Sequence, residues 1–141
     1  QARFIWGHRS QDRYHFAHPL IREVIYNEML GGVRKRYHQR AARVLEQRGT
    51  IGMLDEKIDL LAHHFCRAGE HEKAVIYLAR ATRRARELCA YDTALAYIEQ
   101  ALKIVGQLHQ AAPDEQERTQ RETQRQELLD ARDRLQEKIM P

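Results

Sequence analysis

Residues 58–101 repeat a spacing of small and large apolar side chains, and this repeat restricts the fold more than any other feature. The spacing runs through Ile58, Leu61, Ala62 and Phe65, then Ala74, Leu78 and Ala81, and then Ala94, Ile98 and Ala101. Residues three and four positions apart share one face of a helix, so each set forms one apolar stripe. Alanine in such a stripe lets two helices approach closely, while leucine and phenylalanine fill the remaining space. The pattern therefore predicts stacked helical hairpins.

Helical periodicity extends over most of the chain, and short connections separate the helices. We expect helices over residues 19–30, 33–48, 55–68, 71–88 and 90–106. The pair Gly31 and Gly32 is expected to stop the first of them, and Gly69 to form a turn. Links as short as "AGE" and "CAY" force neighbouring helices to run antiparallel. The helix over 71–88 then takes part in two hairpins.

The N-terminal stretch has a different period. The runs "RFIW" and "YHFAH" are short, aromatic and β-branched, and the turn-like "GHRSQDR" separates them, which predicts a small β-hairpin. At His18-Pro19 the pattern changes to that of a helix. Because proline fits the first helical position and disfavours helical geometry before it, His18 is expected at or next to the N-cap.

The C-terminal stretch is strongly polar at first. Residues 113–127 contain no apolar side chain besides Pro113, so we expect either a solvated helix or a flexible link, with Ala112 in the connection before it. Apolar residues then return at helical spacing, at Leu128, Ala131, Leu135 and Ile139. They fit the first helix of a further repeat or a single helix that packs back on the body.

Composition narrows the class of protein. With 43% apolar and 31% charged residues, the chain fits a soluble helical protein. No apolar run approaches the roughly 18 residues of a membrane helix. The cysteines Cys66 and Cys89 are too few for a disulfide framework, so we expect a cytoplasmic protein with no membrane partner. Because the chain starts at Gln1 without a methionine, we interpret it as a piece of a longer protein.

Three stretches resemble a family of large bacterial signalling proteins. They are "YHFAHPLIREVIYNEML" with "RKRYHQRAARVLE", then "LLAHHFCRAGEHEKAVIYLARA", and then "AYDTALAYIEQAL". The family comprises signal-transduction ATPases of the STAND type, including multidomain adenylate-cyclase and LuxR-like regulators, and the resemblance covers residues 12–106, behind the ATPase module. The spacing from Ile58 to Ala81 looks like a tetratricopeptide repeat, although Ile58 and Arg86 stand where the usual Trp and Pro would be.

In this family a winged helix precedes tetratricopeptide repeats, so the resemblance implies that "YHFAH" is the last strand of a wing. The expected fold is mainly α, with antiparallel tetratricopeptide-like hairpins and a small N-terminal β-hairpin as the remnant of a winged helix. The expected domains are a wing hairpin with linking helices over 1–49, helical repeats over 50–109, and a polar connection with a C-terminal helix over 110–141.

Side chains suited to chemistry do not form a recognised motif. His63, His64, Cys66 and His71 invite a zinc interpretation, but neighbouring residues diverge by about a hundred degrees on a helix, and His71 follows a turn. The sequence also lacks a Walker A motif, GxGxxG and a nucleophile elbow. We therefore predict no metal, cofactor or catalytic residue here, and no enzyme within these residues. Any ATPase or cyclase activity that the resemblance implies would lie outside them.

Two groups of basic residues are candidate contacts for a polyanion or a protein partner. They are Arg34, Lys35, Arg36, Arg40 and Arg43 in one helix, and Arg80, Arg83 and Arg84 in another. The net charge of +4 and the pI near 9.3 permit nucleic-acid binding. A winged helix, however, reads DNA with a helix that precedes its wing, before Gln1.

The leading hypothesis is a non-catalytic interaction and regulatory module of a larger signalling ATPase or transcription regulator. Its partner would be a protein or peptide, or another domain of the same chain. The alternative is a nucleic-acid-binding part of a transcription regulator.

Overall fold

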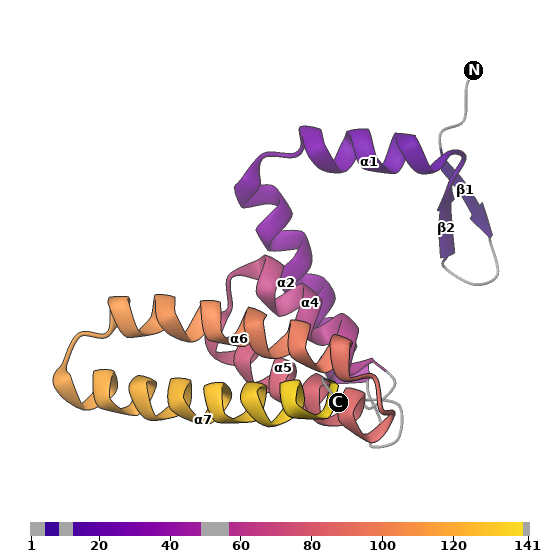
Figure 1. Cartoon of the computed structure of the whole chain (residues 1–141). Helices are drawn as coiled ribbons and strands as arrows, with labels where there is room; N and C mark the ends of the chain where they lie inside the picture. Colours follow the sequence, from indigo (N-terminus) through magenta and orange to yellow (C-terminus); the bar gives the residue numbers. More distant parts are fainter. Residues whose placement is uncertain (1–4, 9–12, 49–56, 140–141) are drawn as a thin grey trace.

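The computed structural model of the chain describes residues 5–8, 13–48 and 57–139, and it is mainly helical (Figure 1). Its elements are β1 (Ile5–His8), β2 (Arg13–Phe16), α1 (Pro19–Glu28), α2 (Gly31–Arg48), α4 (Ile58–Ala68), α5 (His71–Glu87), α6 (Tyr91–Ala111) and α7 (Glu115–Ile139). The expected mainly α class is confirmed. The turn predicted over 7–13 is shorter than expected, because Gly7 and His8 belong to β1 and Arg13 to β2. Residues 9–12 and the boundary expected near residue 49 lie outside the described residues.

An N-terminal arm consists of the β-hairpin and α1 (Figure 1). The strands pair antiparallel with Ile5 opposite Phe16. His18 lies in extended geometry before Pro19, and its Nδ1 accepts a hydrogen bond of 3.2 Å from the backbone N–H of Leu20. The N-cap role expected for His18 is therefore confirmed. This cap supplies a partner for one of the N–H groups that a helix start leaves unpaired.

The break between α1 and α2 comes earlier than expected. The helix α1 ends at Glu28, and Gly31 and Gly32, expected to terminate it, instead form the first turn of α2. Met29 leaves helical geometry, with a ψ of 133°. The Leu30 carbonyl then accepts the first hydrogen bonds of the new helix. Neither glycine has a positive φ, so neither occupies the left-handed geometry that makes glycine a stop signal.

Helices α4 to α7 form an antiparallel stack, and α2 packs against α4 (Figure 1). Two sharp reversals separate the first three. Gly69 caps α4 in the left-handed region with φ 73°, and its N–H donates to the Cys66 carbonyl. Cys89 has φ 57° in the next link. Glycine takes this conformation without steric penalty, which explains the tight link between α4 and α5.

The core of the stack includes every apolar residue of the repeated sequence spacing. The buried members of that pattern are Ile58, Leu61, Ala62, Phe65, Ala74, Leu78, Ala81, Ala94, Ile98 and Ala101. The ring of Phe65 stacks on that of Tyr77 with centroids 5.2 Å apart. Within the described residues no polar or charged side chain other than the tyrosine belongs to this core. Ala62 and Ala74 are almost fully buried in the same core, so α4 and α5 each contribute a small residue to it.

The polar C-terminal stretch is helical and lies along α6. Asp114 begins α7, because its Oδ1 accepts a hydrogen bond of 2.8 Å from the Glu117 N–H. Leu135 is buried, and Leu128 and Ala131 are partly buried beside it. Ala112, expected in a solvated connection, is instead only 6% exposed. The connection between the helices shrinks to three residues, 112–114, and the helix packs back on the body.

The contact between α4 and α5 predicts an asymmetric response to enlarged side chains. Ala74→Phe adds a ring where α5 has no free volume, and overpacking of this kind costs about 1–3 kcal/mol. We expect its melting temperature, followed by circular dichroism, to fall by several degrees. Ala79→Phe makes the same change at an exposed site of the same helix and should leave the melting temperature nearly unchanged. Equal melting temperatures for the two variants would contradict this packing.

Candidate functional site

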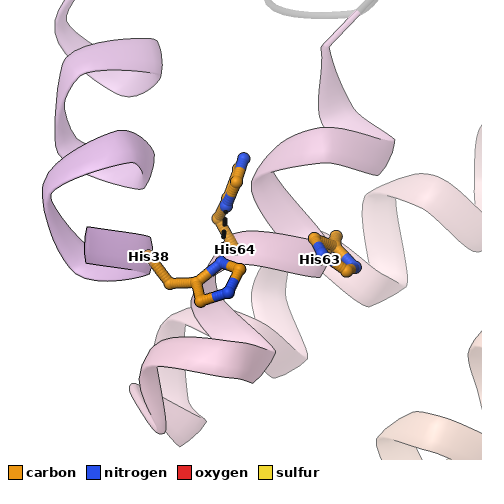
Figure 2. Close-up of side chains that lie close together, drawn as sticks. All are labelled: His38, His63 and His64. Atoms are coloured by element: carbon orange, nitrogen blue, oxygen red, sulfur yellow. Dashed lines mark hydrogen bonds between the residues drawn. The ribbon is translucent and has the colours of Figure 1, made fainter. Parts of the chain in front are cut away.

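Three histidines from two helices converge beside the stack (Figure 2). His38 comes from α2, and His63 and His64 come from α4. The ring centroids lie 5.7 Å apart for His38 and His63, 5.1 Å for His38 and His64, and 5.4 Å for His63 and His64. One ring nitrogen of each lies within 4.8 Å of the others. We call these three residues the histidine cluster.

A chain of hydrogen bonds joins the histidine cluster to the arm. The Tyr26 hydroxyl of α1 lies 2.9 Å from His38 Nε2, and His38 Nδ1 lies 2.9 Å from His64 Nδ1. Each contact holds one hydrogen, so two arrangements of neutral rings satisfy both contacts. In one, His38 Nδ1–H donates to His64, and the tyrosine donates to Nε2. In the other, both directions are reversed. Either way, the chain links α1, α2 and α4.

The surroundings favour neutral rings in this cluster. Burial is the main cause that lowers the pKa of His38, and the neighbouring His64, His63, Arg67 and Arg34 lower it further. Burial also lowers the pKa of His64, with a smaller effect of His63. A proton on either ring would add a positive charge beside the other imidazole and the guanidinium groups. The lowered pKa values of His38 and His64 therefore favour neutral imidazoles, whose nitrogens can bind a metal ion.

Only two of the four residues that were close in sequence, His63 and His64, belong to the histidine cluster. Of the residues weighed as zinc ligands, His63 and His64 lie in the cluster, but Cys66 and His71 belong to no group of three metal-binding side chains within the described residues. Cys66 packs against the core, and burial raises its thiol pKa. His38, which the sequence analysis missed, lies 26 positions from His64. No local spacing signals such a pair, because only the packing of α2 on α4 creates it.

A second polar contact holds α2 against the stack through Glu46. Its Oε2 accepts a hydrogen bond of 2.6 Å from Lys73 Nζ, and its Oε1 accepts one of 2.8 Å from the Tyr77 hydroxyl. The hydrogen bond from Lys73 is the main cause that lowers the pKa of Glu46. Burial, followed by the bond to Glu46, raises the pKa of Tyr77 to about 12. The carboxylate thus ties α2 to α5.

Several basic residues expected on α2 make contacts within the chain. The Arg34 guanidinium lies 5.3 Å from the centroid of the Tyr26 ring, and Arg43 pairs with Glu70 at 3.7 Å. The Lys35 ammonium lies over Gly69. Arg36 and Arg40 are exposed. Lys35 and Arg43 are exposed as well, so most of this basic group faces solvent.

The basic residues expected on α5 line a groove instead. Arg80, Arg83 and Arg84 border a groove of about 560 Å³ together with Ile58, Glu87 and Leu88. The Arg80 guanidinium also lies 5.4 Å from the centroid of the Tyr77 ring. No residue of α2 lines this groove. The structure therefore separates the two basic groups that the sequence suggested.

Comparison with known proteins gives a relative that matches over a small part of its own length. An uncharacterized protein of Rhizobium meliloti (strain 1021) is 34% identical over 99 residues, which make up 70% of this chain and 9% of that protein. No protein-family model matches the chain, and no solved structure matches it. Among the described residues, no helix combines the length and the apolar character needed to span a membrane.

The Glu46 contact predicts a pH-dependent effect of Glu46→Gln. The pKa of this carboxyl is lower in the folded chain than its ordinary value of 4.5. The carboxylate therefore stabilises the fold above the unfolded pKa, and this contribution disappears as pH falls through the lower folded pKa. Since the pair is partly exposed, we expect the variant to lose about 0.5–1 kcal/mol at pH 7.

The measurement is the difference in unfolding free energy between the variant and the wild type, obtained by urea denaturation from pH 7 down to pH 3. The difference should shrink below about pH 4.5. Glu99→Gln, at an exposed position of α6, provides the matched control and should show little difference at any pH. A difference that stays constant with pH would rule out the ionic role of Glu46.

Proposed function

We propose that the chain is a non-catalytic interaction and regulatory module within a larger signalling protein, and that the groove along α5 is its binding surface. The observation that carries this proposal is the combination of arginines and apolar side chains along one groove. Arg80 and Arg83 offer guanidinium groups, which form paired hydrogen bonds to carboxylates. Leu88 offers an exposed apolar side chain at the same surface, and the largely buried Ile58 also borders the groove.

This lining fits an acidic peptide segment with at least one apolar side chain. Leu88 is 69% exposed, so a partner can bury apolar area that the chain itself leaves in water. Glu87 also borders the groove and would repel an acidic residue placed beside it, which helps to fix the register of a bound peptide. The partner is a protein or peptide, or another domain of the same chain.

Two further observations support the proposed context. In the Rhizobium protein the matched residues amount to 9% of the length, so there the stretch belongs to a far longer chain. The alanine and leucine positions that resemble a tetratricopeptide repeat are buried in the stack. We propose that α4 to α6 are tetratricopeptide-like hairpins followed by the C-terminal helix α7, and that the β-hairpin with α1 is the remnant of a winged helix, within a STAND-type signal-transduction ATPase or a related transcription regulator.

Nucleic-acid binding remains the alternative function, because Arg36 and Arg40 are exposed on α2. These residues could contact phosphates without reading bases. Such binding would depend steeply on salt, since each neutralised phosphate releases counterions.

Charge reversal in the groove tests the proposal. We expect Arg80→Glu/Arg83→Glu to weaken binding of a fluorescein-labelled peptide rich in Glu and Leu by about tenfold or more, because each lost charge-assisted hydrogen bond is worth about 1.5–3 kcal/mol. Fluorescence anisotropy measures the affinity. The variant Arg36→Glu/Arg40→Glu, which changes the net charge equally, should bind the peptide as the wild type does.

The same proteins, with Arg34→Glu/Arg36→Glu added, can be titrated with duplex DNA at two salt concentrations. Tight DNA binding that falls steeply with salt, and that is lost in the α2 variants, would favour the alternative function. Equal loss of peptide binding in the groove variant and the Arg36→Glu/Arg40→Glu variant would show that net charge alone attracts the peptide, and the groove would lose its role.

A further inference from the structure

We propose that the histidine cluster of His38, His63 and His64 binds a divalent transition-metal ion of the zinc type. Spacing along the chain argued against a zinc site at His63 and His64, because adjacent residues diverge on a helix. The structure supplies the third donor from another helix, and it brings one nitrogen of each ring within 4.8 Å of the others. Three histidines with an open fourth position form an established kind of zinc site.

The distance between the ring nitrogens of His38 and His64 is close to the spacing of two zinc ligands. Their Nδ1 atoms lie 2.9 Å apart and share one hydrogen. Zinc bonds to imidazole measure about 2.0–2.1 Å, which places tetrahedral ligand nitrogens about 3.3 Å apart. Binding an ion here requires the two rings to separate by a few tenths of an ångström and to tilt until both Nδ1 lone pairs point at the ion. The hydrogen that the two Nδ1 atoms shared then moves to Nε2 of His64. Both atoms already face each other across the α2–α4 contact (Figure 2).

His63 completes the set by a side-chain movement. Its nitrogen lies farther away than the shared pair, within the 4.8 Å limit of the cluster. The side chain is exposed, so its ring can turn toward the ion without disturbing the core. The same exposure leaves the fourth ligand position open to water.

Tyr26 supplies the outer contact that histidine ligands usually have. When Nδ1 of His38 binds the ion, its Nε2 carries the hydrogen and donates to the Tyr26 oxygen, over the 2.9 Å contact already present. Such a partner fixes the tautomer and the ring orientation, and its loss typically lowers metal affinity by 10–100-fold. This arrangement is one of the two that satisfy the hydrogen bonds without an ion.

The ligand type selects the ion, and the neighbouring positive charges limit its affinity. Arg34 and Arg67 act electrostatically on His38, and they oppose any cation. Three imidazoles without a carboxylate suit zinc, cobalt, nickel or copper, whereas magnesium and calcium require oxygen ligands. We therefore expect zinc to bind more weakly than in a site built of cysteine thiolates, and magnesium not to bind.

Titration of the untagged chain with zinc chloride, after treatment with EDTA and dialysis, tests the site by calorimetry. We expect one zinc ion per chain and a higher melting temperature in its presence, with no effect of magnesium chloride. Cobalt chloride should give the visible absorption of tetrahedral Co²⁺. His63→Ala should abolish tight binding without unfolding the chain, since the side chain is exposed. Tyr26→Phe should weaken binding by about tenfold or more.

His15→Ala is the matched control, because His15 is exposed on the hairpin and outside the cluster. It should bind zinc as the wild type does. The proposal would be overturned if the chain did not bind one zinc ion, or if His63→Ala still bound zinc tightly. It would also be overturned if His15→Ala weakened binding as much as His63→Ala. Each of these results would indicate only adventitious contact with surface histidines.

Discussion

The close approach of α4 and α5 at Ala62 and Ala74 sets the positions of the other helices. Because both residues are small and almost fully buried in one core, they leave room for the two helices to approach. Gly69 makes that approach feasible, since its left-handed geometry reverses the chain within a single short link. Phe65 and Tyr77 then stack across the pair, and Ala42 of α2 is fully buried against the same core. The position of α2, and with it the position of His38, follows from this one contact.

Features that depend on local sequence could be predicted. The buried stripes of α4, α5 and α6 follow from helical spacing, and the cap at His18 follows from the proline after it. The wrong expectations have a common origin in signals that depend on context. Gly31 was expected to stop a helix, although glycine acts so mainly when its φ is positive. Ala112 was expected in the connection before the polar stretch, where an enlarged side chain would do little, yet it is only 6% exposed.

The histidine cluster could not be predicted in full, because one of its three residues comes from a distant part of the chain. His63 and His64 drew attention because they are neighbours, which is also the reason they were rejected as a pair of ligands. The decisive partner is separated from them by the link between α2 and α4, so only tertiary packing reveals it. The basic residues behave in the same way. Composition identified them, but it could not distinguish Arg43, which pairs with Glu70, from Arg83, which lines the groove.

The arm depends on polar contacts to a greater degree than the stack does. Helix α1 buries none of its residues, and Tyr26 links it through His38 to His64. Hydrogen bonds of this kind are each worth only about 0.5–1.5 kcal/mol. An ion bound to His38 and His64 would close a loop across 26 positions, and in the chain-entropy description a cross-link of that length contributes about 3–4 kcal/mol. His38 and His64, which now share one hydrogen, would then join α2 and α4 through a metal, and α1 would stay attached through the hydrogen bond between Tyr26 and His38.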